Sequence, residues 1–362
     1  MNTRSTDQDG QQQPGKRRIF RKFLVFLTIV ILLGAMIVGY FLYSAFFLPN
    51  IRTPKQQDFI LLIRTNSGFT EVKKELYDNA IIIDRESFIW LANQKKYPQK
   101  IRPGRYVIKN GMSNQQLIDL LRSGAQSPIK LTFNNVRDIK QLAGRISKQI
   151  EADSNAILSL LNDKQTVSNM GFTKESLPAM FIPNTYEFYW TTNAAGFVSR
   201  MSKEYKNFWN DSRKAKAKAI HLSPVEVSTL ASIIDRETAV NSEKPAIAGV
   251  YLNRLKSGWL LQADPTLIFA VGDFSIKRVL DIHKQVESKY NTYKYPGLPP
   301  GPICVPSISS IDAVLNPQKH EYFYFCAKDD FSGTHAFART YNEHIVNARK
   351  FQQALNKQKI YK

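Results

Sequence analysis

The feature that most constrains the fold of this sequence is an apolar run near its N-terminus. Residues 23–48 contain no charged side chain, and about 20 predominantly apolar residues are enough for an α-helix to cross the hydrocarbon core of a bilayer. The apolar region of a cleaved signal peptide is shorter, at roughly 7 to 15 residues, and a small-x-small cleavage site follows it. Tyr43-Ser44-Ala45 fits that site poorly. We therefore predict an uncleaved transmembrane helix over residues 23–48.

Residues 1–22 form a polar, Gln-rich tail that ends in a basic cluster, made of Lys16, Arg17, Arg18, Arg21 and Lys22. Basic residues that flank a membrane span are retained on its cytoplasmic side. We therefore predict that residues 1–22 are a cytoplasmic tail and that residues 23–48 are a single-pass anchor in the cytoplasmic (inner) membrane. Everything after the anchor then lies on the outer side, which is periplasmic or extracellular.

The chain carries a formal net charge of +20, of which residues 1–22 supply +4. Nucleic acid is the common partner of so basic a protein, but a segment beyond the cytoplasmic membrane rarely meets it. We expect no nucleic-acid partner. Acidic polymers of a cell wall, or the anionic headgroups of lipids, suit a basic surface in that compartment.

The sequence offers little for metal or cofactor chemistry. Its five histidines are scattered, and it has neither a metal-binding Cys/His spacing nor a Gly-rich phosphate loop. Cys304 and Cys326 could pair in an oxidising compartment, although the apolar run around Cys326 is typical of a buried strand. We predict no metal and no cofactor, and the pairing of the two cysteines stays open.

A helix with strong start signals begins near residue 223. Ser223 suits the N-cap, Pro224 suits the first helical position, and Glu226 completes a capping box. Further along, Leu230, Ile233, Ile234 and Glu237 have the spacing of one helix face, so the stripe that should face the core ends in a carboxyl group.

Glu237 is therefore the candidate for a general acid. Apolar neighbours disfavour the charged form of a carboxyl group, which raises its pKa and keeps it protonated near neutral pH. Asp235 lies about 200° away around the helix, so the two acids cannot form a pair. The alternative is an ordinary Glu in the last turn of a helix, half exposed or paired with Arg236.

The next segment contains a second helix over residues 242–257 and a turn at residues 261–266. Asp264 followed by Pro265 reads as an N-cap and a first helical residue, which we favour over a second catalytic carboxylate. Gln262 has no such structural role. Its amide can both donate to and accept from sugar hydroxyl or acetamido groups, so it is a groove candidate.

With 362 residues, the chain is long enough for two or three modest domains. We predict a short polar linker at residues 49–57 and then a small βααβ unit within residues 58–134. Its elements are a strand at 59–65, helices at 70–77 and 85–93, and a strand at 105–108. Ser113 and Gln116 form another capping box, and a further strand is expected at 129–133.

Residues 136–163 are predicted to be helical, and residues 181–190 are dense in aromatic side chains. Tyr and Trp combine flat apolar faces with a polar edge, a combination that suits sugar rings. We assign Phe181 and Phe188 to the core, and we take Asn184, Tyr186 and Glu187 as groove candidates. Glu187 is the nearby rival to Glu237 as the acid.

The last part of the chain has two features that could shape a cleft. Residues 290–301 form an irregular loop rich in turn formers. Residues 322–327 and 334–338 are predicted to form a β-hairpin that carries His335, and a helix over about 340–355 follows. A lone His on a strand is more often structural than catalytic.

Five short motifs occur in the same order as in a known family: residues 231–238, 250–255, 261–266, 290–293 and 297–301. Together with the predicted architecture, they resemble the endolytic murein (peptidoglycan) transglycosylases. In that family the second acidic residue of the first motif is the catalytic Glu, which falls on Glu237. The first acidic position is usually Glu, whereas this chain has Asp235.

The resemblance implies an α+β fold: an N-terminal transmembrane helix, a small βααβ lysin-motif-like module over residues 58–134, and a mainly helical catalytic domain over residues 135–362 with a C-terminal β-hairpin. It also implies a membrane-anchored lytic transglycosylase that cleaves peptidoglycan glycan strands beside the wall-synthesis machinery. Glu237 would be its catalytic residue. The candidates for substrate binding are Gln262, Asp264, Asn253, Tyr186, Asn184 and Tyr290.

Two alternatives remain at this point. A muramidase-type hydrolase would use Asp264 as a second carboxylate, since ordinary glycosidases need two. A membrane-anchored scaffold could bind glycan without cleaving it, and the lysin-motif-like module could equally be a spacer that sets the height of the active site above the membrane.

Overall fold

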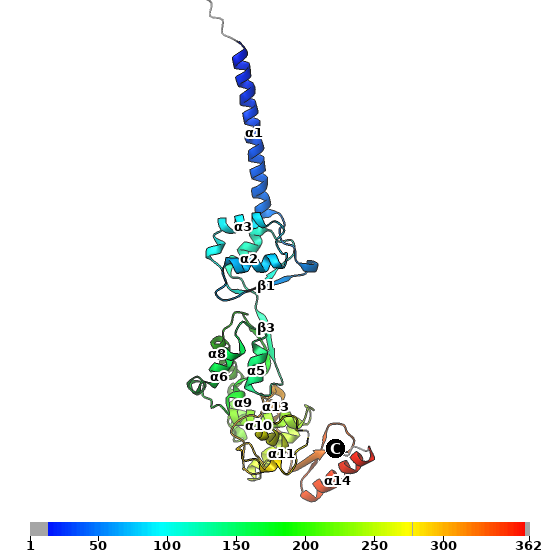
Figure 1. The fold of residues 1–362 in the computed structure, drawn as a ribbon. Helices are drawn as coiled ribbons and strands as arrows, with labels where there is room; N and C mark the ends of the chain where they lie inside the picture. The colour runs from blue at the N-terminus through cyan, green and yellow to red at the C-terminus, as the bar shows by residue number, and fades with distance from the viewer. Residues whose placement is uncertain (1–13, 277, 359–362) are drawn as a thin grey trace, which may run out of the picture. The chain divides into compact units, whose positions relative to one another are not determined.

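The computed structural model describes residues 14–276 and 278–358, without the side chains of residues 14–17. The first thirteen residues of the predicted cytoplasmic tail therefore lie outside the described residues. By its internal contacts the chain divides into two compact units, residues 1–127 and 128–362 (Figure 1). Helices and strands are both present, and helix dominates.

Helix α1, Pro14–Phe47, covers the predicted span at residues 23–48 except for its last residue. Its segment Arg18–Phe47 is long and apolar enough to cross a membrane. Large apolar side chains along it are exposed, Met36 and Ile37 among the most exposed of them. A helix with this apolar surface is compatible with a single-pass membrane anchor, because lipid would cover the side chains that the protein leaves uncovered.

The first part of the segment predicted to be a polar linker packs against the first unit. Ile51 and Thr53 are buried, and so is Asn50. The Asn50 amide donates to the Asp84 carbonyl at 2.8 Å and to Asn114 Oδ1 at 2.7 Å, and its own oxygen accepts from the Asp84 N–H. Buried groups therefore hold residues 50–53 in place, whereas residues 54–57 are exposed.

The first unit has the predicted strand-helix-helix-strand order. Strand β1, Phe59–Ile63, pairs antiparallel with β2, Gly104–Ile108, with Leu61 opposite Tyr106. Helices α2, Phe69–Asp78, and α3, Arg85–Gln94, lie between the strands in the sequence, and α4, Asn114–Ser123, follows them. The capping box of Ser113 and Gln116 is present at the start of α4.

The strand at residues 129–133 belongs to the second unit, which corrects the predicted boundary at residue 134. Strand β3, Ile129–Phe133, pairs antiparallel with β4, Asn184–Phe188, and Leu131 lies opposite Tyr186. The boundary falls between Ser127 and Pro128. The pairing partner is more than 50 residues away in the sequence, beyond the reach of local patterns.

The region predicted to be helical, residues 136–163, contains two helices, α5, Ile139–Ile146, and α6, Ser154–Asn162. Each begins with its own N-cap, Asp138 or Asp153, whose carboxylate accepts from the backbone of the first turn. The short helix α7, Lys164–Asn169, follows.

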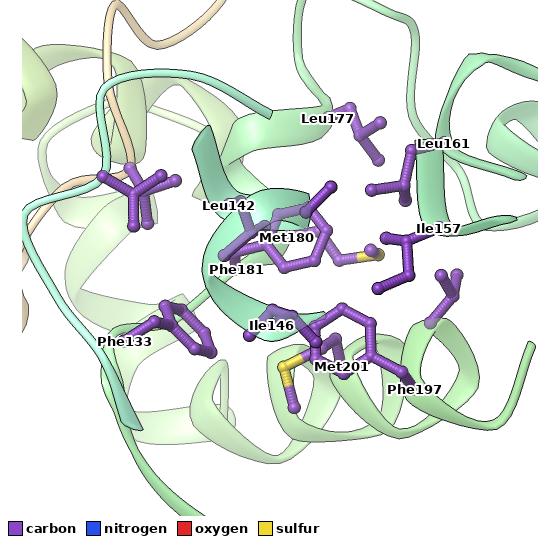
Figure 2. Close-up of a cluster of buried hydrophobic side chains, with 14 of the residues drawn as sticks. Phe133, Leu142, Ile146, Ile157, Leu161, Leu177, Met180, Phe181, Phe197 and Met201 are labelled. Atoms are coloured by element: carbon purple, nitrogen blue, oxygen red, sulfur yellow. The ribbon is translucent and has the colours of Figure 1, made fainter. Parts of the chain in front are cut away.

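The first core of the second unit lies among β3, β4, α5, α6 and α8, Ala194–Phe208 (Figure 2). Phe181 and Phe188 are buried in it, as predicted, and both contact the ring of Phe197. Helix α9, Asp211–Ala219, leads from this core to the second one.

The second core of this unit is built from α10, Pro224–Glu237, α11, Lys244–Lys256, α12, Asp264–Val271, and α13, Ile308–Leu315. Near the C-terminus, β5, Tyr324–Ala327, pairs antiparallel with β6, His335–Ala338. Helix α14, Tyr341–Lys357, packs on both strands (Figure 1). The candidate site lies among these elements.

Candidate active site

Helix α10 places Glu237 as the sequence predicts. Ser223 caps the helix, with its hydroxyl accepting from the Glu226 N–H and the Glu226 carboxylate accepting from the Ser223 N–H. Ile233 and Ile234 are fully buried in the second core. Glu237 is the last helical residue and is partly buried, so the apolar face of α10 ends in its carboxyl group.

The environment of Glu237 favours its protonated form. Burial raises the pKa of this carboxyl group to about 7, and the nearby Asp264 charge acts in the same direction. The hydrogen bond from the Tyr251 hydroxyl, 2.5 Å from Glu237 Oε1, and the positive charge of Arg254 oppose the shift. Glu237 can therefore give up a proton and take one back near neutral pH.

Glu237 opens into a cavity of about 360 Å³ between α11, the turn before α12, β5, β6 and α14. The lining residues are Glu237, Tyr251, Arg254, Gln262, Asp264, Tyr293, Tyr324, Phe325, Cys326, Ala327, His335, Tyr341 and His344. The cavity is within the size range of ligand-binding clefts. Three of the predicted site residues, Glu237, Gln262 and Asp264, share it.

Asp264 is not the N-cap of α12, contrary to the prediction. Ala263 holds that position in extended backbone, and Asp264 is the first helical residue. Its carboxylate faces the cavity and accepts from the Tyr293 hydroxyl at 2.5 Å. Burial, together with this bond, raises the pKa of Tyr293. An acidic residue suits either position, because the N-terminal end of a helix carries partial positive charge.

Gln262 lines the cavity from a constrained turn. Its backbone φ of +48° lies in the left-handed region, which is uncommon for a residue other than glycine. Thr292 holds the turn: its carbonyl accepts from the Gln262 N–H and its hydroxyl accepts from the Ala263 N–H, both at 3.0 Å. Backbone strain that the surroundings enforce in this way is concentrated at functional sites.

Arg254 joins three segments around the cavity. It is buried on α11, and its guanidinium donates to the carbonyls of Phe323, just before β5, at 2.8 Å and of Leu261 at 2.5 Å. It also lies close enough to Glu237 to favour that residue's ionised form. Arg254 therefore holds the walls of the cavity together and contributes a positive charge beside the acid.

Four predicted substrate-binding residues lie elsewhere. The Asn253 amide donates to the carbonyls of His320 and Tyr322, so it fixes the chain before β5. Tyr290 packs against Phe269 of α12 with the ring centroids 4.6 Å apart, and burial raises its pKa to about 12. Neither residue lines the cavity at Glu237.

The other two belong to the β3–β4 sheet of the first core. Tyr186 is buried, stacks on Phe133 and donates its hydroxyl to the Ile182 carbonyl at 2.6 Å. Asn184 is exposed at the start of β4, and its side-chain oxygen accepts from the Thr185 N–H. Neither lines the cavity at Glu237.

Glu187, the rival acid, borders a different cavity of about 530 Å³ beside α8. It is exposed, so its carboxyl group lacks the desolvated setting of Glu237. Glu187 and Glu237 therefore lie at different cavities, and only Glu237 shares its cavity with Asp264 and Gln262.

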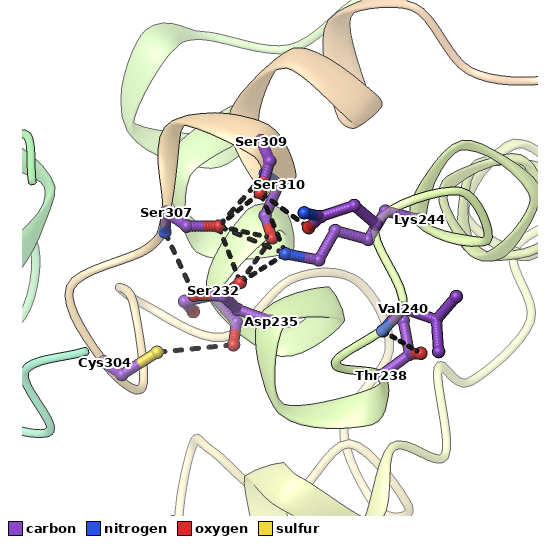
Figure 3. A network of polar contacts seen from close by, with 10 residues as sticks. Ser232, Asp235, Thr238, Val240, Lys244, Cys304, Ser307, Ser309 and Ser310 are labelled. Carbon is purple, nitrogen blue, oxygen red and sulfur yellow. Dashed lines mark hydrogen bonds and ion pairs between the residues drawn. The ribbon is translucent and has the colours of Figure 1, made fainter. Parts of the chain in front are cut away.

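Asp235 does not line the cavity and has a polar network of its own (Figure 3). Its carboxylate accepts from Lys244 Nζ at 2.9 Å and from the hydroxyls of Ser307 and Ser310 at 2.7 and 2.6 Å. Burial alone would raise the pKa of Asp235, but these hydrogen bonds and the Lys244 charge hold it below its ordinary value. The network fixes the end of α10 to the start of α11 and α13.

His335 lies on the cavity wall and has a partner in Glu243. Glu243 Oε1 accepts from the backbone N–H of His335 at 2.6 Å, and Glu243 Oε2 lies 3.0 Å from His335 Nδ1. Cys326 also lines the cavity and is half buried, whereas Cys304 is buried elsewhere; both are free thiols. Among the described residues, no cluster of His, Cys, Asp and Glu suits a metal ion.

Sequence reasoning missed Tyr251, Arg254 and Tyr293. The first two are three residues apart on α11 and so share one helix face, whereas Asn253 points elsewhere. Tyr251 and Arg254 both belong to the buried face of α11, and an aromatic and a basic residue on one buried helix face could have indicated a site. For Tyr293 the sequence has no signal beyond its place in the 290–293 motif.

Comparisons with known proteins identify the family of this chain. The model of the YceG-like family matches residues 61–350. An endolytic murein transglycosylase of Bacillus subtilis (strain 168) is 28% identical over 89% of this chain and 92% of its own length. One from Streptococcus pneumoniae serotype 2 (strain D39 / NCTC 7466) is 26% identical over 90% of this chain but only 63% of its own length.

A crystal structure of a YceG-like protein from Listeria monocytogenes is also similar. It has a TM-score of 0.53 and 27% sequence identity, and the match covers 80% of this chain and 99% of that one. The family match covers parts of both units, residues 61–127 and 128–350, and every cavity-lining residue. This chain, which is similar to proteins named endolytic murein transglycosylases, therefore belongs to the YceG-like family.

Proposed function

We propose that this protein is an endolytic lytic transglycosylase that cleaves the bond between N-acetylmuramic acid and N-acetylglucosamine within peptidoglycan strands. The single observation that carries the proposal is the partly buried carboxyl group of Glu237, whose pKa burial raises to about 7, at the wall of a polar cavity. The relatives with that name and the shared family support the substrate class.

The proposed reaction needs one carboxyl group in two roles. Protonated Glu237 donates its proton to the glycosidic oxygen, and the bond from that oxygen to C1 of the muramic acid breaks through an oxocarbenium-like state. The resulting Glu237 carboxylate takes the proton from the C6 hydroxyl of the same sugar. The oxygen at C6 then bonds to C1, which closes a 1,6-anhydro ring and restores the acid.

The neighbours of Glu237 suit this exchange. Between the two steps the carboxylate is charged, and the Tyr251 hydroxyl and the Arg254 charge both favour that form. Gln262 and Asp264 are the groups we assign to holding the sugar, since both line the cavity and offer hydrogen-bonding atoms. Asn253, Asn184, Tyr186 and Tyr290 have no part in this scheme.

One digestion tests the proposal. Purified peptidoglycan is incubated with the full-length protein in detergent and, separately, with the Glu237→Gln variant, and the products are weighed by mass spectrometry. We expect anhydro-ended fragments from the wild type and no fragments from the variant. Cleavage by Glu237→Gln at the wild-type rate would exclude Glu237 as the acid.

Asp264 gives a second candidate function. Its carboxylate lines the same cavity and lies close enough to Glu237 to influence its pKa. A hydrolase of the muramidase type would use that carboxylate on water or on the sugar ring. The same digestion separates the two reactions, because hydrolysis leaves reducing ends in place of anhydro ends.

We further propose that α1 anchors the protein in the cytoplasmic membrane with its N-terminus inside, so that the residues after α1 lie beside newly made strands and their synthases. The strand-helix-helix-strand order of the first unit supports its assignment as a lysin-motif-like glycan-binding module. Protease added to intact spheroplasts should then digest the parts of both units that follow α1 and leave the tail protected. Protection of the second unit would reverse the proposed orientation.

A further inference from the structure

Besides Glu237, the cavity is lined by three aromatic rings, those of Tyr324 on β5 and of Tyr341 and His344 on α14. Arg254 connects these rings to the acid. Its guanidinium carbon lies 6.0 Å from the ring centroid of Tyr251, the partner of Glu237, and 5.9 Å from that of Tyr324.

The three rings form one contiguous group. Tyr324 and His344 are stacked, with centroids 5.3 Å apart and an interplanar angle of 20°, and Tyr341 lies 6.0 Å from Tyr324. Burial, together with Arg254, lowers the pKa of His344. Its ring is therefore uncharged at neutral pH and presents an aromatic face like those of the two tyrosines.

Tyr341 remains largely exposed within this group, at 60% of its surface. It lies in the first turn of α14, a helix with no fully buried residue. A large aromatic side chain that borders a catalytic cavity while its surface stays open has area left for a ligand to cover.

The chemistry of the group suits a sugar ring better than a peptide stem. A pyranose has an apolar C–H face that can lie on an aromatic ring, with hydroxyl groups at its rim for Gln262 and Asp264 on the cavity wall. A stem peptide carries carboxylates and would need a free cation. Arg254 instead directs its guanidinium to two backbone carbonyls.

We propose that Tyr324, Tyr341 and His344 form a saccharide subsite for the amino-sugar ring next to the bond that is cleaved. The subsite rests on the proposed function, since it takes the next ring of the same glycan strand. It would orient the strand so that the scissile oxygen reaches Glu237.

The test measures glycan binding apart from catalysis. The full-length Glu237→Gln protein in detergent is titrated calorimetrically with stem-free glycan oligomers of the peptidoglycan repeat. Adding Tyr341→Ala should raise the Kd about three- to tenfold, the equivalent of one aromatic contact, whereas Tyr341→Phe should leave it nearly unchanged. Val346→Ala is the matched control, because Val346 is also exposed on α14 and lies outside the cavity lining.

An unchanged Kd in Tyr341→Ala would overturn the subsite. So would an equal loss in Val346→Ala, which would point to general loosening of α14. A titration with stem peptide alone that responds to Tyr341→Ala would show a peptide site instead. These outcomes do not depend on the digestion result, because binding is compared among variants that all lack the acid.

Discussion

Replacing Glu237 by Gln should make the protein more stable at neutral and alkaline pH than the wild type. The folded protein holds the pKa of Glu237 at about 7, whereas the ordinary value is 4.5. Below pH 4.5 the carboxyl group is protonated in both the folded and the unfolded chain. As pH rises through the folded pKa, the folded state must accept a poorly solvated charge, and the stability that the protonated form provides is lost.

The size of the effect follows from the shift. A difference of about 2.5 pKa units, at about 1.36 kcal/mol per unit, amounts to roughly 3 kcal/mol between about pH 4.5 and about pH 7.5. Gln keeps an oxygen to accept from the Tyr251 hydroxyl but does not titrate. The free energy of unfolding of Glu237→Gln, relative to the wild type, should therefore increase by about 3 kcal/mol across that range.

Thermal unfolding of the two full-length proteins in detergent, followed across that pH range, measures this difference. Other titrating groups are common to both proteins and cancel. For a unit of the size of residues 128–362, the Tm of the variant should exceed that of the wild type by about 6 to 12 °C at the alkaline end of the pH range. Parallel pH profiles for the two proteins would refute the reasoning, because they would mean that Glu237 titrates alike in the folded and unfolded chain.

The contacts also predict the effects of three further substitutions. Tyr251→Phe removes a hydrogen bond that favours ionised Glu237, so the pKa read from the pH dependence of kcat/KM should rise above that of the wild type; an unchanged or lowered value would contradict the geometry. Asp235→Ala leaves its buried lysine partner unpaired and should cost about 3 to 5 kcal/mol in chemical denaturation, whereas a loss below about 1 kcal/mol would mean that the network is exposed to solvent. Gly301→Ala would place a Cβ 2.0 Å from the carbonyl oxygen of residue 175 and should lower the Tm by several degrees. The control is Gly144→Ala on helix α5, where the added Cβ meets nothing within 4 Å, and it should raise the free energy of unfolding by about 0.5 to 1 kcal/mol.

What could be predicted from the sequence was local. The capping box at Ser223 and the apolar stripe of α10 depend on spacings of three and four residues, and they placed Glu237 correctly at the end of a buried face. The strand-helix-helix-strand order of the first unit followed from similar short-range signals. Periodicity and capping act within one element, so they carry over directly to the folded chain.

What could not be predicted depends on distant partners. Asp264 faces the cavity through a hydrogen bond with Tyr293, 29 residues further on, and a sequence pattern cannot distinguish that position from an N-cap. Asn253 looked like a groove residue but bonds to carbonyls more than 65 residues away. In each case the polar side chain is satisfied by a long-range contact that has no local signature.

The central claim is that the Glu237 carboxyl group stays protonated close to neutral pH. The most direct measurement is the infrared band of a protonated carboxyl group in the wild type minus Glu237→Gln, recorded as a function of pH. We predict a single band that disappears with a midpoint near pH 7. A midpoint near 4.5, the value of an ordinary solvated glutamate, would contradict the account.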